Sequence, residues 1–411
     1  MAQKKSIWVQ LSSGKYSLIF LILLLAFSLR LLTALCYEAA SERTHYLGFD
    51  ESVYYSLAYH MRHTSPLKYT LHDAPLFFQT YRVWYIDQPL FHHPPLFPWS
   101  LMAVQFILGS GFFGGRLLNV FLGTVGVYVT YLLGKKVSPR VGILSALLLS
   151  LSPLHMQLSA FVLMEMMLSV FVSVFLLYVI KTIEDGKLMN AVSAGMILGL
   201  GLLTKYTMAL TLPALAFLAL RRKMSKSAFA IILFTGGLIF SFWVVLNVET
   251  YDISTFIYNW KMITEYGNSS QVPFYAYLVF LPVVAPTTIL SYISLLRCEG
   301  RGGGNEFRTM LIIVCAGFIL FHMAHPIKDM RLILPVLPPL LILGSDFLAS
   351  LPRRFLFPIL ISATTVSLYA SLVIVSGGYL WYLDFWHYLD WYGYFLNPFR
   401  LLGLNLQSSQ T

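Results

Sequence analysis

Long apolar segments most limit what this chain can fold into. A helix that crosses a bilayer needs roughly 20 apolar residues. Eleven segments of the 411-residue chain approach or reach this length, near residues 16–36, 116–134, 141–158, 162–181, 190–204, 206–220, 228–247, 273–296, 309–325, 331–350 and 355–376. Only 11% of the residues are charged, whereas a soluble domain has roughly 25%. The sequence therefore predicts an all-α polytopic membrane protein with about eleven transmembrane helices.

The basic residues indicate how these segments are oriented. Residues 94–113 are also apolar enough to span, but counting them as a span would turn the later basic loops outward. Without that span, the cytoplasmic pieces hold 17 of the 28 Lys and Arg residues, as cytoplasmic loops usually do. We therefore predict that 94–113 is a juxtamembrane or re-entrant helix on the outer side of the cell membrane and that the N-terminus is cytoplasmic.

This topology defines the expected domains. Residues 1–376 form a transmembrane domain whose first outer loop, 37–115, carries juxtamembrane helices. Residues 377–411 begin with an aromatic-rich stretch, and aromatic residues favour the headgroup zone of a membrane. We expect this tail to lie at the interface.

Ionisable residues gather at the predicted outer face, where they are costly and hence candidates for function. The cations are Arg116, Lys205, Lys328 and Arg331, with His92 and His93 nearby, and the carboxylates are Asp50, Glu51 and Glu165. Cations could hold a phosphate leaving group while a carboxylate removes a proton from the acceptor. The simpler alternative for Asp50 and Glu51 is that they cap the helix predicted to follow them.

Three further expectations concern single residues. His45, Asp50, His92 and His93 could hold a divalent metal, although no paired ligand motif accompanies them. Arg30 lies deeper in the first apolar segment, where it should pair with a buried acceptor or extend to the surface. The three cysteines, Cys36, Cys298 and Cys315, are expected to be free thiols.

Five short motifs carry a resemblance to a known family. In chain order they are Phe49-Asp50-Glu51, His93-Pro-Pro-Leu-Phe-Pro-Trp99, Gly115-Arg116-Leu-Leu-Asn119, Gly201-Leu-Leu-Thr-Lys205-Tyr206 and Lys328-Asp-Met-Arg331-Leu-Ile-Leu-Pro335. Over about residues 15–350 the chain resembles the GT-C superfamily of membrane glycosyltransferases. The similar branch holds the protein O-mannosyltransferases and the bacterial aminoarabinose transferase, glycosyltransferase family 39 and its relatives.

The resemblance implies roles for the residues that match the family, namely Asp50, Lys205, His93, Arg116, Arg331 and Glu165, and we add Glu51, Lys328, His92 and Tyr54 as further candidates. Asp50 is the expected catalytic base, and Glu51 orients Asp50 or the acceptor. The expected ligands of the donor phosphate are Lys205, Arg331, His93, Arg116 and Lys328. Supporting roles near the acceptor fall to Glu165, His92 and Tyr54. Many members of the family carry Asp where this chain has Glu165, which puts a direct catalytic role for Glu165 in doubt.

The expected function is transfer of a sugar from a polyprenyl-phosphate donor to a hydroxyl acceptor at the outer face, with inversion at C1. The partners would be the lipid-linked sugar, membrane lipids and a lipid, glycan or protein acceptor, without nucleic acid. Two alternatives are a lipid or lipid-linked sugar flippase and a non-catalytic subunit of a glycosylation complex. A flippase would favour polar groups near the bilayer midplane and internal repeats, and we find no convincing repeat.

Overall fold

The computed structural model describes residues 14–44, 49–67, 69, 90–91, 93–254, 257, 274–296, 305–325 and 329–376, and every element named within these ranges is a helix. The elements are α2 (Gly14–Thr44), α3 (Phe49–His63), α5 (Leu96–Leu108), α6 (Phe112–Gly134), α7 (Pro139–Ser150), α8 (Pro153–Leu158), α9 (Met164–Asp185), α10 (Leu188–Thr204), η1 (Tyr206–Thr211), α11 (Leu212–Leu220), α12 (Lys226–Tyr251), α14 (Ala276–Val284), η2 (Pro286–Thr288), α15 (Ile289–Leu296), α16 (Asn305–Ala324), η3 (Met330–Val336), α17 (Leu337–Ser350) and α18 (Arg353–Ser376). The predicted tail, 377–411, lies outside the described residues.

Seven of the described helical segments are long and apolar enough to cross a membrane. They lie at Leu18–Ala39, Phe112–Gly134, Met164–Asp185, Lys226–Val248, Glu306–Ala324, Met330–Ser350 and Arg354–Ser371. The bent pair of α14 with η2 and α15 would be an eighth span. This confirms the all-α membrane class, while the count of eleven stays a prediction because the segments near 141–158, 190–204 and 206–220 form shorter apolar helices.

Two predicted spans are broken, and proline accounts for both breaks. The segment 141–158 divides into α7 and α8 at Ser152-Pro153, and the chain bends by 118° between α14 and the helices that begin at Pro286. Proline lacks an N–H and its ring clashes with the preceding turn, so it begins a helix readily but interrupts a continuous one.

Arg30 binds the backbone at the break between α7 and α8. The side chain is fully buried and donates hydrogen bonds to the carbonyl oxygens of Leu149 at 3.1 Å and Ser150 at 3.2 Å. Its Nη2 also lies 2.8 Å from His155 Nδ1. The last carbonyl groups of a helix have no partner within the helix, so Arg30 satisfies two of them. Of the two expectations for Arg30, pairing with a buried acceptor is confirmed.

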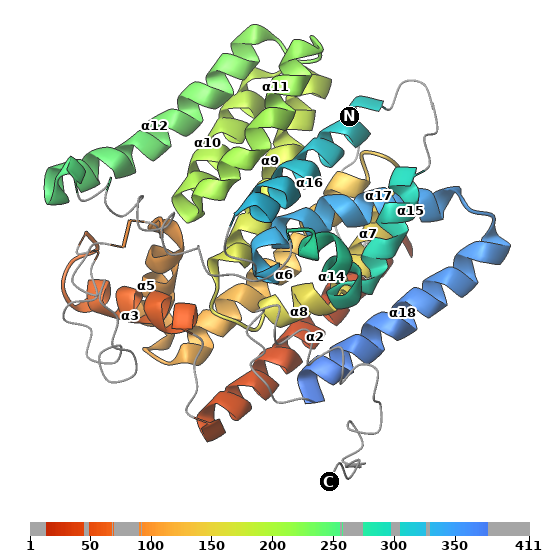
Figure 1. Ribbon diagram of the computed structural model, residues 1–411, viewed down its shortest axis with the longest axis horizontal. Coiled ribbons are helices and arrows are strands. Elements are labelled where there is room, and N and C mark those ends of the chain that lie inside the picture. Colours follow the sequence, from red (N-terminus) through yellow and green to blue (C-terminus); the bar gives the residue numbers. More distant parts are fainter. Residues whose placement is uncertain are drawn as a thin grey trace, which may run out of the picture.

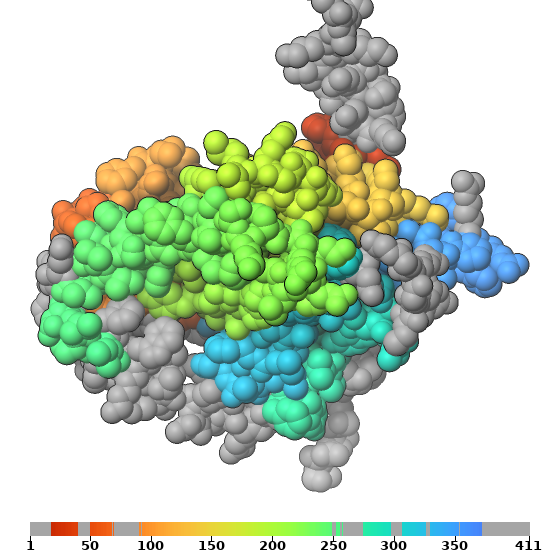
Figure 2. Space-filling view, turned by 90° about the horizontal axis from the view of Figure 1, so that it is seen from above, coloured from red at the N-terminus to blue at the C-terminus, as the bar shows by residue number. Residues whose placement is uncertain are grey.

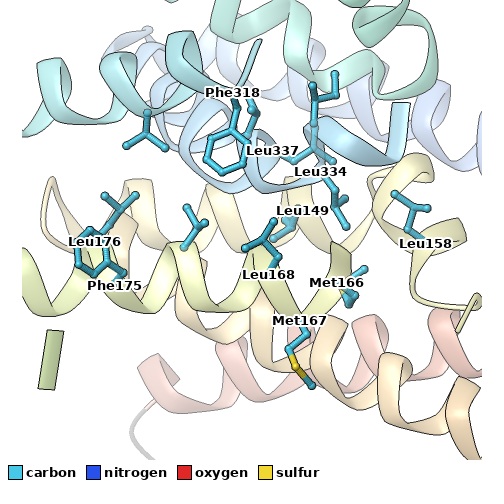
Figure 3. Packing of buried hydrophobic residues seen from close by; sticks show 14 of the residues in the cluster. Leu149, Leu158, Met166, Met167, Leu168, Phe175, Leu176, Phe318, Leu334 and Leu337 are labelled. Carbon is cyan, nitrogen blue, oxygen red and sulfur yellow. The ribbon is translucent and has the colours of Figure 1, made fainter. Parts of the chain in front are cut away.

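The core lies around α9 and the unit of η3 with α17. In the spans that contain them, 72% and 78% of the most apolar 18-residue stretch is buried. The corresponding shares are 17% in the span of α12 and 22% in that of α18. Figure 3 shows Leu168 of α9 below Leu334 of η3 and Leu337 of α17. Figure 2 shows α12 on the outside of the helical body. The exposed side chains of α12 include Phe234 and Phe242, as expected for a face that contacts lipid.

The helices α3 and α5 pack against each other at one end of the molecule (Figure 1). The described part of the predicted outer helix, α5, has 13 residues and is therefore about 20 Å long at about 1.5 Å per residue. The hydrocarbon core is about 30 Å thick. The length of α5 thus agrees with a helix that does not span.

Glycines let α10 and α12 approach closely. A Cβ atom added to Gly195 would lie 2.8 Å from the carbonyl oxygen of Ile232, whereas one added to Gly237 would meet nothing within 4 Å. We expect Gly195→Ala to lower the free energy of unfolding by about 1–3 kcal/mol through overpacking. Gly237→Ala, the matched control, should leave stability unchanged or slightly higher. Thermal unfolding in detergent measures both, and equal effects would contradict this account of the helix contact.

Candidate active site

Four helix ends bring charged side chains together. Asp50 lies in the first turn of α3, Glu165 in the first turn of α9, and Lys205 immediately after α10. Arg331 lies in the first turn of η3. These residues are up to 281 positions apart in the chain, yet ion pairs connect all four. We call this set, together with Asp329, the ion cluster.

Arg331 is the centre of the ion cluster. Its Nη2 forms an ion pair with Asp50 Oδ2. Its Nε lies 2.7 Å from Asp329 Oδ2 and 3.9 Å from Glu165 Oε1. The side chains of Arg331 and Asp50 each keep 15% of their surface exposed. One guanidinium group therefore faces three carboxylates while the site stays accessible.

Asp329 fixes the start of η3. Its Oδ1 accepts a hydrogen bond from the backbone N–H of Arg331 at 2.9 Å, the usual role of a helix-capping carboxylate. Its own backbone N–H donates to the Tyr277 hydroxyl oxygen at 2.9 Å. Burial raises the pKa of Asp329 to about 6, although the charge of Arg331 acts in the opposite direction. Asp329 is thus held in place from both its backbone and its side chain.

Lys205 and Glu165 form the other side of the ion cluster. Lys205 Nζ lies 2.6 Å from Glu165 Oε1, and the two side chains are 20% and 1% exposed. The second oxygen of Glu165, Oε2, is buried without a hydrogen-bond partner among the described residues. A buried acceptor without a partner is unfavourable, so Glu165 Oε2 offers a place for a donor from a bound molecule.

Tyr54 connects the ion cluster with the segment that carries His93. The buried Tyr54 hydroxyl lies 3.3 Å from His93 Nδ1, and the hydroxyl of Tyr69 donates to the His93 carbonyl oxygen. Burial, with the carboxylates of Asp50 and Glu165, raises the pKa of Tyr54 well above its ordinary value. Tyr54 therefore stays protonated and can act as a hydrogen-bond donor.

Glu51 and Arg116 belong to a separate buried cluster. Arg116 is fully buried, with Nη1 3.1 Å from Glu51 Oε1 and Nε 2.5 Å from Glu38 Oε2. Glu51 also accepts hydrogen bonds from the Val162 backbone N–H at 2.8 Å and the Tyr37 hydroxyl at 3.0 Å. The guanidinium carbon of Arg116 lies 4.0 Å from the centre of the Tyr37 ring. This arrangement joins α2, α3 and α6 to the turn before α9.

The structure thus divides the predicted site residues into three groups. Asp50, Glu165, Lys205 and Arg331 come together, with Tyr54 and His93 beside them. Glu51 and Arg116 lie in the second cluster, where Arg116 is engaged by carboxylates. His92 and Lys328 lie outside the described residues, as does His45.

The expectations about metal and cysteine are tested only in part. Within the described ranges, no group of three or more His, Cys, Asp or Glu side chains could hold a metal ion. The proposed set cannot be assembled there because His45 and His92 are outside those ranges. Cys36 and Cys315 are free, and Cys298 lies outside the described residues.

Two solved structures show what fold this chain resembles. The structure of ArnT from Cupriavidus metallidurans bound to undecaprenyl phosphate matches with a TM-score of 0.68 and 18% identity, covering 89% of this chain and 65% of that chain. The oligosaccharyltransferase AglB from Archaeoglobus fulgidus, in complex with an inhibitory peptide and a dolichol-phosphate, matches with a TM-score of 0.56 and 13% identity, covering 90% and 56%. The chain spans at most about two thirds of the length of these structures, and it has the GT-C fold.

A family match agrees with this fold. Residues 92–247 match the family described as "Dolichyl-phosphate-mannose-protein mannosyltransferase". This range contains His93, Arg116, Glu165 and Lys205, whereas Asp50 and Arg331 lie beyond its ends. None of the curated proteins matches the chain. The predicted resemblance to GT-C glycosyltransferases of the protein O-mannosyltransferase and aminoarabinose transferase type is confirmed.

Proposed function

We propose that this protein transfers a sugar from a polyprenyl-phosphate carrier to a hydroxyl acceptor at the outer face of the cell membrane. The observation that carries the proposal is the ion cluster, in which Asp50 and Lys205 are linked through Arg331 and Glu165. A proton acceptor and two cations thus meet in one partly exposed site. The fold shared with proteins solved with undecaprenyl phosphate or dolichol-phosphate supports a donor of this class.

The donor phosphate would lie against Arg331 and Lys205, with His93 on the side of Tyr54. Arginine binds phosphate through paired N–H groups, and lysine acts as a compact charge. Lys328 is one residue before Asp329 in the sequence and stays a proposed phosphate ligand. These cations stabilise the phosphate as it leaves, because their positions are set before the reaction.

Asp50 would act as the base in a single in-line step. Its carboxylate takes the proton of the acceptor hydroxyl while that oxygen forms a bond to C1 of the sugar. The bond from C1 to the phosphate oxygen breaks, and the lipid phosphate keeps the electron pair. Attack opposite the leaving group inverts C1. No covalent intermediate with the protein is required.

Other predicted site residues take positioning roles in this proposal. Glu51 and Arg116 hold the start of α3, and therefore Asp50, against the turn before α9. Arg116 acts on the donor indirectly, since its guanidinium group is buried against Glu38 and Glu51. Glu165 Oε2 and the Tyr54 hydroxyl are available to bind hydroxyl groups of the sugar or the acceptor.

The test is incubation of the purified full-length protein in lipid nanodiscs with polyprenyl-phosphate mannose or polyprenyl-phosphate glucose and a mixture of lipid, glycan and peptide acceptors. Release of polyprenyl phosphate together with a glycosylated acceptor is the expected result. In sealed vesicles, movement of intact lipid-linked sugar without release would instead support the flippase alternative. If the protein neither releases polyprenyl phosphate nor moves the intact lipid, the alternative of a non-catalytic subunit is the one that remains.

A further inference from the structure

Tyr206 follows Lys205 of the ion cluster directly in the chain and is the first residue of η1. Its hydroxyl donates a hydrogen bond to the backbone carbonyl oxygen of Phe91, 115 positions away in the sequence. Phe91 lies two residues before His93, one of the proposed phosphate ligands. One hydrogen bond therefore joins the residue after Lys205 to the segment that carries His93.

Phe91 belongs to a short turn that ends at His93. The His93 backbone N–H donates to the Leu90 carbonyl oxygen at 2.9 Å, and we call the segment that this hydrogen bond closes the His93 turn. The Leu90 backbone N–H donates to the Tyr69 carbonyl oxygen at 3.1 Å. The side chains of Leu90 and Phe91 are buried. Because the turn is closed by its own hydrogen bond, a contact that fixes the Phe91 carbonyl group also fixes the position of His93.

The side chain of His93 leads from this turn toward the ion cluster. Its Nδ1 lies 3.3 Å from the Tyr54 hydroxyl, and the two rings meet edge to face with their centres 5.0 Å apart. The charges of Asp50 and Arg331 both act on the Tyr54 hydroxyl, so Tyr54 lies beside the ion cluster. A shift of the His93 turn would therefore move the imidazole relative to the cations of the cluster.

The ring of Tyr206 has a separate support on α12. Its centre lies 5.8 Å from that of Phe240, in an edge-to-face arrangement. Trp243, three residues further along α12, is 2% exposed, and its ring lies 5.1 Å from that of Tyr69 and 6.2 Å from that of Phe91. Phenylalanine at position 206 would keep the ring against α12 and lose the hydrogen bond to Phe91. The hydroxyl can therefore be tested apart from the packing.

We propose that Tyr206 is a positioning residue that holds the His93 turn so that the imidazole of His93 and the ammonium group of Lys205 meet the same donor phosphate. This inference rests on the proposed function, because the phosphate concerned is that of the polyprenyl-phosphate donor. Tyr206 acts through the Phe91 carbonyl group and not by touching the phosphate. Without its hydroxyl, the His93 turn loses a contact that orients the imidazole.

The role makes a specific statement about affinity. We expect Tyr206→Phe to raise the Kd for undecaprenyl phosphate about fivefold and His93→Ala to raise it about tenfold, as expected for loss of a hydrogen bond to a charged group. In the His93→Ala background, Tyr206→Phe should change the Kd by less than about twofold, because the group that it positions is already absent. Binding is measured with the full-length protein in nanodiscs, with undecaprenol as the lipid that lacks phosphate.

Steady-state kinetics separates positioning from a loss of folded protein. Tyr206→Phe should raise the KM for the lipid-linked donor about fivefold, since a contact with the bound substrate is weakened. A sample that only contains less folded protein would have a lower kcat and an unchanged KM. Tyr292→Phe is the matched control, because it removes a hydroxyl that donates to the Leu278 carbonyl oxygen at 3.2 Å, outside the ion cluster. The control should leave both the Kd and the KM unchanged.

The outcomes separate this role from the proposed function. A higher Kd for Tyr206→Phe that disappears in the His93→Ala background supports the role. An unchanged Kd, an equal rise with and without His93, or a lower kcat at unchanged KM overturns the role while the proposed function stands. If His93→Ala leaves the Kd unchanged, the ligand on which the role depends is absent and the role is overturned as well. If the wild type binds undecaprenyl phosphate no better than undecaprenol, the donor class and the role of Tyr206 both fail.

Discussion

Asp50→Asn is expected to lower sugar transfer by about 10²–10⁴-fold, the range usually supplied by a positioned acid or base. Asparagine matches aspartate in size but cannot take the proton of an acceptor hydroxyl. The variant should still fold, because Arg331 and Lys205 keep Asp329 and Glu165 as partners. Transfer is measured as product formed from saturating polyprenyl-phosphate sugar, and folding as the thermal unfolding midpoint in detergent.

Two comparisons make this result interpretable. Asp50→Glu keeps a base on a longer side chain and should recover part of the activity. Asp346→Asn removes an exposed partner of Arg308, 3.8 Å away, and should have activity close to that of the wild type. Near-normal transfer by Asp50→Asn, in a sample with normal thermal stability, would remove Asp50 as the base.

The second large effect concerns stability. Glu51→Leu is expected to lower the free energy of unfolding by about 3–5 kcal/mol, the usual cost of removing one partner from a buried ion pair. Arg116 is fully buried, and the substitution leaves its charge with Glu38 as the remaining acidic partner among the contacts described above. The Val162 N–H and the Tyr37 hydroxyl lose their acceptor as well. Denaturation in detergent measures the effect.

A double variant tests the cause. In Glu51→Leu/Arg116→Met both buried charges are replaced by apolar side chains, so the double variant should be more stable than Glu51→Leu alone. Glu184→Gln breaks the exposed ion pair with Lys136 and should change stability by less than about 1 kcal/mol. If the double variant is the less stable of the two, or Glu51→Leu behaves like the wild type, the buried charge is not the reason for the effect.

Much of the fold follows from hydrophobic patterning. Apolar length predicts the helical membrane class, because apolar side chains transfer favourably into lipid. The placement of Lys and Arg predicts that α5 does not span, and its short length agrees with that prediction. The prolines at 153 and 286 mark the two breaks in the sequence, but a search for long apolar segments does not take proline into account. Proline marks a helix start as readily as it fits an apolar window.

The ion cluster was predicted in part. Ionisable residues are rare at membrane depth, so their position in or beside apolar segments singles out Glu165, Lys205 and Arg331, along with Arg30 and Arg116. Asp50 stands out because it follows the first apolar segment. Asp329 stands two residues before Arg331 in the last motif, and Asp is among the residues that most often cap a helix, so its capping of η3 has a sequence signal. The partners of Glu51 were missed. Glu38 is an ordinary charged residue of α2, and the Val162 contact is made by a backbone N–H, which residue identity does not predict.

The ion cluster draws its members from positions 50, 165, 205 and 331, and this spacing matters during synthesis. A nascent chain that has not reached Arg331 carries Asp50 without its main counter-ion. Insertion of the segment that carries Arg331 therefore completes the ion cluster, and we expect a chain that stops before Arg331 to lack the centre of the site.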